Sequence, residues 1–457
     1  MCKEYPASGN IKLTLRNRRV AIRPRRCLIT SLIGMLLVIA FPITGQAFSV
    51  LAHQAIVDQS WDQTLLPELR RQFPNASEQE LREAHSYARG GSHLPDLGYF
   101  PLGSHLFSDL LHYVRTGDFI TRLLNEASSP DEYAFALGML AHYEADIIGH
   151  AEATNLAVPI IYPKLAEQYG EDVTYADSPS AHLETEFRFD ILQAAHRREI
   201  PGLLEHSIEF KVPKEFLEKV FRETYGVELR DLFVSYGVAI NTYRWGFRTL
   251  IDEGTGIAWA LYSQDIESLE PGVTSQQFAQ VTSRADFVHE FGKAFLEPGY
   301  FVQFVGFIGN LVPNIGPLKR LPYKPLPQSV QQLYFRAFHN AYEEYIREVG
   351  AIAKNSAVLA NLNLDTGRGS QFERYPPADK TYVELLERNA RDHFANTPTD
   401  LTNDMHAHFS DPDAALAFET SQRDRREAVS ALSELDSAVR DGRGRHPRKI
   451  GEIASKH

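Results

Sequence analysis

The sequence predicts an all-α protein. Apolar residues recur at helical spacing from about residue 48 onwards, as in Leu183, Phe187, Ile191 and Leu192, whereas alternating strand patterns are sparse. The chain has 457 residues, of which 43% are hydrophobic and 23% charged. This composition is typical of a globular protein with a large core.

The N-terminal segment has the order of a signal peptide. Residues 1–26 carry eight Lys or Arg and one acidic residue, and an apolar run follows at residues 27–43. Gly45 and Ala47 then occupy the small-residue positions of a cleavage site after Ala47. We expect residues 1–47 to be a cleaved signal peptide, with an uncleaved membrane anchor as the alternative. The remaining chain would be secreted or periplasmic, or anchored facing outward.

Most of the elements that follow are predicted helices. Ser77 and Glu80 have the spacing of a capping box at the start of the first clear helix. Residues 90–105 are rich in Gly and Pro and predict a loop. Further helices are expected at residues 106–127, 129–153, 180–198, 214–226, 229–251 and 332–352. Residues 301–328 are apolar and rich in Gly and Pro, and predict either a packed loop or a flap that contacts lipid through Phe301, Phe304 and Phe307.

Histidines are concentrated in one part of the chain. Ten of the 17 fall between residues 53 and 206. In the stretch "LAHYEADIIGH", His142, Asp146 and His150 are four residues apart and share one face of a helix. Buried polar groups need partners, and a divalent metal ion would supply them. Single pairs of this kind are usually hydrogen-bonded surface pairs, but the repetition favours a metal site.

A second pair has the same spacing. His182 and Glu186 lie at i and i+4, so both can reach one ion. The only two cysteines, Cys2 and Cys27, lie in the N-terminal segment, which excludes a cysteine zinc site in the rest of the chain. Nitrogen and oxygen ligands of this kind suit zinc.

The order of His53, Asp96 in "HLPDLGY", His105, "HYEAD" with His150, and His182 with Glu186 resembles the zinc-dependent phospholipase C family. Single-strand nucleases share that family's fold and metal site. The resemblance covers about residues 48–200. It implies an all-α fold, a cluster of three zinc ions, and hydrolysis of phosphate esters by a metal-activated water.

The resemblance also implies the role of each residue. The implied zinc ligands are Phe48 (through its amine and carbonyl after cleavage), His53, Asp96, His105, His142, Asp146, His150, His182 and Glu186. Asp96 would be the general base, and Asp146 would bridge two ions. His112 is the alternative to His105, which we favour. Other histidines, among them His85, His93, His196 and His206, are expected to form local hydrogen bonds, and Asp58 and Asp62 to be helix-start or surface acids.

These implications define the expected organisation. A phospholipase C-like catalytic domain would span residues 48–345, followed by a helical extension at 346–420 and a charged tail at 421–457. The net charge is −12, and removal of the basic segment makes the remainder more acidic, which disfavours nucleic acid. We therefore expect a phospholipid substrate, with a single-strand nuclease or phosphomonoesterase as the alternative and a non-catalytic metal-stabilised envelope protein as a further one.

Overall fold

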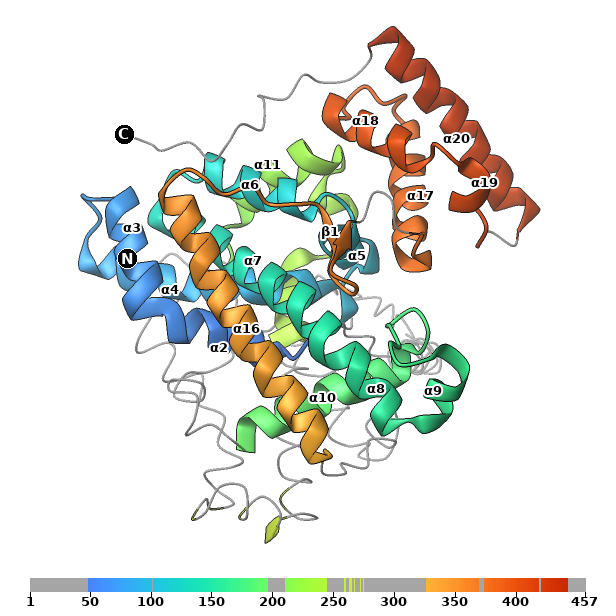
Figure 1. Cartoon of the computed structure of the whole chain (residues 1–457). Coiled ribbons are helices and arrows are strands. Elements are labelled where there is room, and N and C mark those ends of the chain that lie inside the picture. Colours follow the sequence, from blue (N-terminus) through green and yellow to red (C-terminus); the bar gives the residue numbers. More distant parts are fainter. Residues whose placement is uncertain are drawn as a thin grey trace, which may run out of the picture. The chain divides into compact units, whose positions relative to one another are not determined.

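The computed structural model describes residues 48–100, 102–195, 210–244, 326–369, 374–418 and 421–442, with isolated positions between 259 and 274 (Figure 1). The signal segment, the cleavage after Ala47, His196, His206 and the three phenylalanines at 301–307 lie outside these residues.

Helices make up most of the described chain, so the all-α prediction is confirmed. The helices up to residue 126 are α2 (Val50–Ser60), the π-helix η1 (Trp61–Leu65), α3 (Leu66–Gln72), α4 (Glu78–His93), the 3₁₀ helix η2 (Leu94–Tyr99), α5 (His105–Tyr113) and α6 (Thr116–Glu126). The next are α7 (Pro130–Gly149), the π-helix η3 (His150–Thr154), α8 (Asn155–Ile161), α9 (Pro163–Tyr169), α10 (Pro179–Ala195), α11 (Lys214–Tyr225) and the 3₁₀ helix η4 (Leu229–Asp231). The C-terminal ones are α16 (Gln328–Ala353), α17 (Pro376–Ala390), α18 (Thr399–His408), α19 (Pro412–Ala415) and α20 (Gln422–Asp441). Among the residues that the structure describes, the only strands are β1 (Leu362–Asn363) and β2 (Arg368–Gly369), which pair antiparallel.

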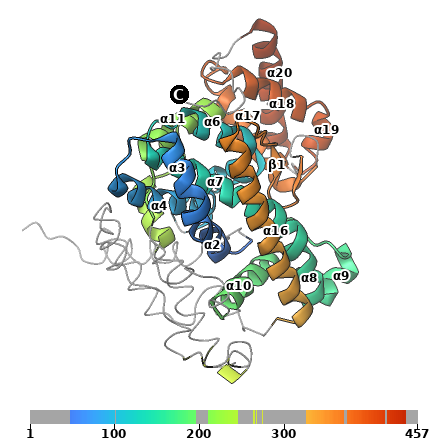
Figure 2. The same cartoon turned by 60° about the vertical axis from the view of Figure 1, so that its left-hand side comes forward.

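Helix α7 carries the histidine stretch and packs against α4 and α16 (Figures 1 and 2). It begins at Pro130, where the Ser129 hydroxyl accepts a hydrogen bond from the Glu132 amide. Glycines bring α4 and α7 unusually close: a Cβ on Gly138 would meet the Ala88 carbonyl oxygen at 1.9 Å, and one on Gly91 would meet the Phe135 carbonyl oxygen at 2.1 Å. Only glycine permits this approach of two backbones.

The expected loop at residues 90–105 is partly helical. The capping box of Ser77 and Glu80 forms as predicted, but α4 continues through Gly90 and Gly91 to His93. Glycine in a helix costs about 1 kcal/mol relative to alanine. Here the close packing of Gly91 on α7 outweighs that cost, so tertiary contact overrides the local preference.

The expected helix at 106–127 is interrupted. α5 ends at Tyr113, and Arg115 adopts a left-handed backbone conformation (φ 53°) before α6 begins at Thr116. The Arg115 guanidinium donates to Asp118 and, at 2.7 Å, to Asp400. These contacts stabilise a break that periodicity does not reveal.

The C-terminal part differs from the expected extension and tail. α16 is continuous from Gln328 to Ala353, so the expected boundary between residues 345 and 346 falls inside one helix. Residues 422–441 form α20 rather than a tail, because Ala428, Ala431, Leu435 and Ala438 line one buried face against α17 and α18. The many charged residues occupy its other face.

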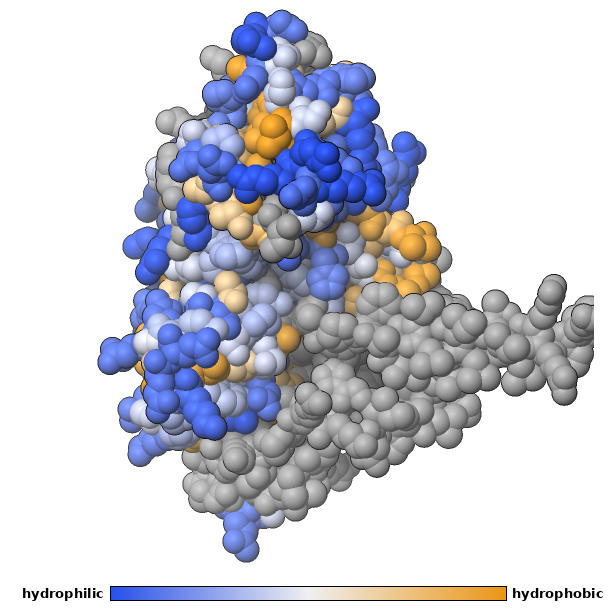
Figure 3. All heavy atoms as spheres, turned by 90° about the vertical axis from the view of Figure 1, so that its right-hand side faces the viewer, coloured by the Kyte–Doolittle hydropathy of each residue, from blue (hydrophilic) through white to orange (hydrophobic). Residues whose placement is uncertain are grey.

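The described helices include none that is both long and apolar enough to cross a membrane. Figure 3 shows that the face carrying the C-terminal helices is mainly hydrophilic, with scattered apolar areas.

Candidate metal centre

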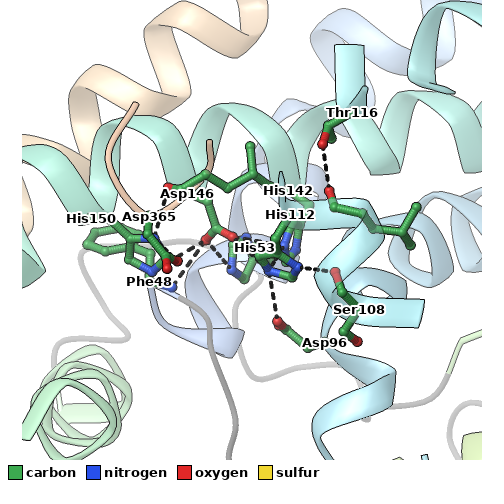
Figure 4. Close-up of polar contacts among 12 residues, drawn as sticks. Phe48, His53, Asp96, Ser108, His112, Thr116, His142, Asp146, His150 and Asp365 are labelled. Carbon is green, nitrogen blue, oxygen red and sulfur yellow. Dashed lines mark hydrogen bonds and ion pairs between the residues drawn. The ribbon is translucent and has the colours of Figure 1, made fainter. Parts of the chain in front are cut away.

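The carboxylate of Asp146 lies at the centre of a buried group of histidines (Figure 4). Its Oδ2 is 2.9 Å from His142 Nε2 and 3.4 Å from His112 Nε2. Its Oδ1 is 3.2 Å from His53 Nε2 and 3.9 Å from His150 Nε2. The two oxygens therefore face two different sets of donor atoms, as expected of a bridging carboxylate.

A second group lies beside it. Glu186 Oε1 is 2.9 Å from His182 Nε2 on the same helix, α10, and 3.1 Å from His150 Nε2. His150 begins the π-helix η3, which directly continues α7. π-Helical turns are rare and occur often at functional sites.

Asp96 joins the cluster from η2, and its partner is His112 rather than His105. Asp96 is 1% exposed, and its Oδ1 is 3.6 Å from His112 Nε2. His105 is exposed at the first residue of α5, where its ring contacts Tyr99. His112 lies two turns further along the same helix and is fully buried. The sequence-based preference for His105 over His112 was therefore wrong. The sequence of the loop before α5 does not show which turn of that helix faces the cluster.

Within the described residues, three groups can bring ligand atoms within 4.8 Å of one another. They are His53 with His142 and Asp146; Asp96 with His112 and His142; and His150 with His182 and Glu186. Eight of the nine residues expected from the sequence lie here or, in the case of Phe48, at the edge of the first group.

Phe48 reaches the cluster through its backbone. Its nitrogen is 3.2 Å from Asp146 Oδ1. Its fully buried ring packs on Phe189 and Tyr334. Gly149 leaves the space for this ring, since a Cβ there would meet Phe48 Cγ at 2.0 Å.

Asp190, one turn beyond Glu186 on α10, anchors the start of α2. Its Oδ1 accepts hydrogen bonds from Ser49 Oγ at 2.5 Å and from the Leu51 amide at 2.9 Å. A carboxylate at a helix N-terminus is favourable because it satisfies free amides. This residue was missed, although its spacing from His182 and Glu186 continues the same i, i+4 row.

The hydrogen bonds on the outer side of three rings fix which nitrogen faces the cluster. His142 Nδ1 is 2.9 Å from the Ser92 carbonyl oxygen, His112 Nδ1 is 2.8 Å from that of Ser108, and His150 Nδ1 is 3.0 Å from that of Leu364. A carbonyl can only accept, so each Nδ1 carries a proton and each Nε2 faces inward, where its lone pair can bind a metal ion when the ring is neutral. This is the usual arrangement of metal-binding histidines.

Several inward atoms have no hydrogen-bond partner in the described structure. They are both ring nitrogens of His53 and His182, both oxygens of Asp96, and Asp146 Oδ2. Such atoms, fully buried, are costly to leave unsatisfied. Because imidazole and carboxylate together match zinc, the residues present fit the zinc expected from the sequence.

The pKa values of the buried carboxylates and histidines also favour a bound cation. Burial alone would raise the pKa of Asp146, but His142, His150 and His53 outweigh it and hold this pKa well below 3.8. Burial lowers the pKa of His150, yet Asp146 and Glu186 raise it to about 10. Burial, with the charges of Asp146 and Glu186, raises the pKa of Asp96 well above 3.8. The carboxylates of Asp96, Asp146 and Glu186 would repel one another when ionised, and a divalent cation would relieve that repulsion.

One sequence interpretation of a neighbouring residue was wrong, and another is confirmed. Asp58 is neither a helix-start nor a surface acid: its buried carboxylate is 2.7 Å from Arg89 Nε and 2.8 Å from His85 Nε2. His93 forms hydrogen bonds, as expected: its Nε2 is 3.1 Å from Gln54 Oε1 and its Nδ1 is 3.2 Å from the Tyr243 hydroxyl. Burial lowers the pKa of His93 to about 3, so this ring is neutral.

The fold and site define an all-α protein with a buried cluster of zinc-type ligands. Residues 52–233 match the family model of zinc dependent phospholipase C. The match confirms, for these residues, the resemblance inferred from the motifs. No curated protein and no solved structure matches the chain.

Proposed function

We propose that the protein is a zinc-dependent phosphodiester hydrolase of the phospholipase C type. The observation that carries the proposal is the set of three buried ligand groups, in which the ring nitrogens of His53 and His182 and the carboxylate oxygens of Asp96 lack hydrogen-bond partners in the described structure. The family match over residues 52–233 supports the class of activity.

The distances suggest how three ions would be shared. Asp96, His112, His142 and Asp146 Oδ2 would hold one ion, and Asp146 Oδ1, His53 and the Phe48 nitrogen would hold another. His150, His182 and Glu186 would hold the third. Asp146 would then bridge two ions, because its two oxygens have separate surroundings.

Zinc bound here would lower the pKa of an attacking water and neutralise charge on the phosphoryl oxygens. Asp96 is the carboxylate placed at the edge of the cluster on the short helix η2, and its oxygens have no competing hydrogen bond. It would accept a proton from the water as the water oxygen attacks phosphorus. The bond from phosphorus to the leaving alcohol then breaks, and that alkoxide takes up a proton.

We further propose export and cleavage after Ala47. An uncleaved chain would present the Phe48 nitrogen as an amide, which is a poor metal ligand, whereas cleavage would make it a free amine 3.2 Å from Asp146 Oδ1. The acidic chain, with a net charge of −12, favours a phospholipid over a polyanionic nucleic acid, and contact of Phe301, Phe304 and Phe307 with the lipid surface is part of this proposal.

The test uses exported protein with its first residue determined and zinc restored. Wild type and Asp96→Asn are compared for release of phosphorylated head group from phosphatidylcholine vesicles and of nucleotides from single-stranded DNA. We expect Phe48 as the first residue, lipid hydrolysis by the wild type, and a loss of about 10²–10⁴-fold in the variant, the usual contribution of a general base. Cleavage of DNA alone would contradict the phospholipase assignment, and a chain starting at Met1 would contradict the cleavage.

A further inference from the structure

The short segment around β1 and β2 enters the metal centre from outside the family-matched region. The match ends at residue 233, whereas this segment spans residues 361–369. The Leu364 carbonyl oxygen accepts from His150 Nδ1 at 3.0 Å. The Leu364 amide donates to the His112 carbonyl oxygen at 3.0 Å. One residue of this segment therefore contacts two of the proposed ligands.

Asp365 fixes that segment in place. Its Oδ2 accepts hydrogen bonds from the hydroxyls of Tyr113 at 2.8 Å and Tyr375 at 2.7 Å. Its carbonyl oxygen accepts from Asn155 Nδ2 at 2.9 Å, and its amide donates to Asn363 Oδ1 at 2.9 Å. Elements distant in the chain thus converge on this one buried residue.

The second carboxylate oxygen of Asp365 faces the outer side of the His150 ring. Oδ1 lies 3.6 Å from His150 Nδ1 and has no hydrogen-bond partner in the described structure (Figure 4). Nδ1 is on the outer side of the ring, opposite the nitrogen that points to Glu186. Asp365 is therefore placed behind a ligand rather than as one.

We propose that Asp365 is a positioning residue of the zinc centre, acting through His150. Its two tyrosine hydrogen bonds hold the Leu364 carbonyl against the ring, and its Oδ1 presents negative charge to the same N–H. Both effects keep the proton on Nδ1 and make Nε2 a stronger donor to a metal ion. The inference rests on the proposed zinc site, and it makes the C-terminal half of the chain part of that site.

The experiment measures zinc directly. Wild-type protein, Asp365→Asn and Asp379→Asn are stripped of metal, and zinc affinity and stoichiometry are determined by chelator competition. Asp379 is the matched control: it is also buried, also lies C-terminal to the family match, and accepts from Arg374 Nη1 at 3.1 Å beside His408. In the described part of the chain its polar side-chain partners are Arg374 and His408, and neither is a proposed ligand.

We expect Asp365→Asn to weaken one of the three ions by about 10–100-fold, the usual effect of losing an outer partner. Asp379→Asn should bind zinc as the wild type does. Tyr375→Phe, which removes one hydroxyl and keeps the carboxylate, should weaken the same ion less and serves if Asp365→Asn does not fold. Wild-type affinity in both Asp365→Asn and Tyr375→Phe, or an equal loss in Asp379→Asn, would overturn the proposal. A wild type that binds no zinc would instead refute the proposed function.

Discussion

Two buried polar clusters share helix α2 and differ in one respect. His53 belongs to the metal-type cluster around Asp146, whereas Asp58, five residues later, belongs to a cluster with His85 and Arg89. In the second cluster Arg89 supplies a permanent positive charge 2.7 Å from the carboxylate. Around Asp146 the nearest groups are imidazoles, which must stay neutral to bind metal.

The consequence of losing a buried carboxylate therefore depends on what balances its charge. One that is balanced by an arginine from its own chain needs no further ion, and loss of either partner destabilises the fold. Carboxylates that gather with several imidazoles and no arginine or lysine leave the balancing charge to be supplied from outside. The first arrangement predicts an effect on stability alone, and the second predicts an effect on metal binding.

The largest expected effect that separates the two clusters comes from Asp58→Asn. Removing this charge leaves Arg89 buried without its counter-ion, which should cost about 3–5 kcal/mol of unfolding free energy. Zinc stoichiometry should stay at the wild-type value, and chelation should still destabilise the variant as it does the wild type. Calorimetry with and without chelator measures the unfolding free energy and its dependence on zinc. Loss of zinc from Asp58→Asn would show that the Asp58 cluster is not independent of the metal centre.

The same cluster gives a direction for the pH dependence. Burial would raise the pKa of Asp58, but Arg89 and His85 outweigh it and hold this pKa well below 3.8. Because the folded-state pKa is depressed, the stabilisation is present above the unfolded pKa and is lost as the pH falls below about 4. Asp58→Asn should therefore flatten the acid side of the stability profile.

Much of the metal centre could be predicted from the sequence because its helical members are spaced at i, i+4. His142, Asp146 and His150, and His182 with Glu186, needed only the geometry of one helix each. The choice between His105 and His112 failed because it depended on how the chain turns before α5. Asp365 has no local signal, because tertiary contacts, among them those with Tyr113 and Tyr375, bring it beside His150.

A smaller loss of stability should come from Gly149→Ala, which tests whether the space at Gly149 is needed to position Phe48. The added Cβ would meet the Phe48 ring at 2.0 Å, and such overpacking typically costs about 1–3 kcal/mol. Moving the ring also moves the nitrogen away from Asp146, so we expect weaker binding of the ion that uses His53. Gly350→Ala is the control, because nothing lies within 4 Å of its added Cβ in α16. Equal zinc affinity in both variants would show that Phe48 does not help to hold an ion.

The smallest expected effect, and the sharpest test of which histidine belongs to the cluster, is that of His105→Ala. This exposed residue contacts Tyr99 but none of the three ligand groups, so its removal should change stability by less than about 0.5 kcal/mol and leave zinc affinity unaltered. His112→Ala, on the same helix, removes the ring between Asp96 and Asp146 and should abolish binding of the ion that they share. Zinc titration of the two variants side by side decides the assignment. If His105→Ala lost the ion and His112→Ala kept it, the inward face of α5 would have to be assigned anew.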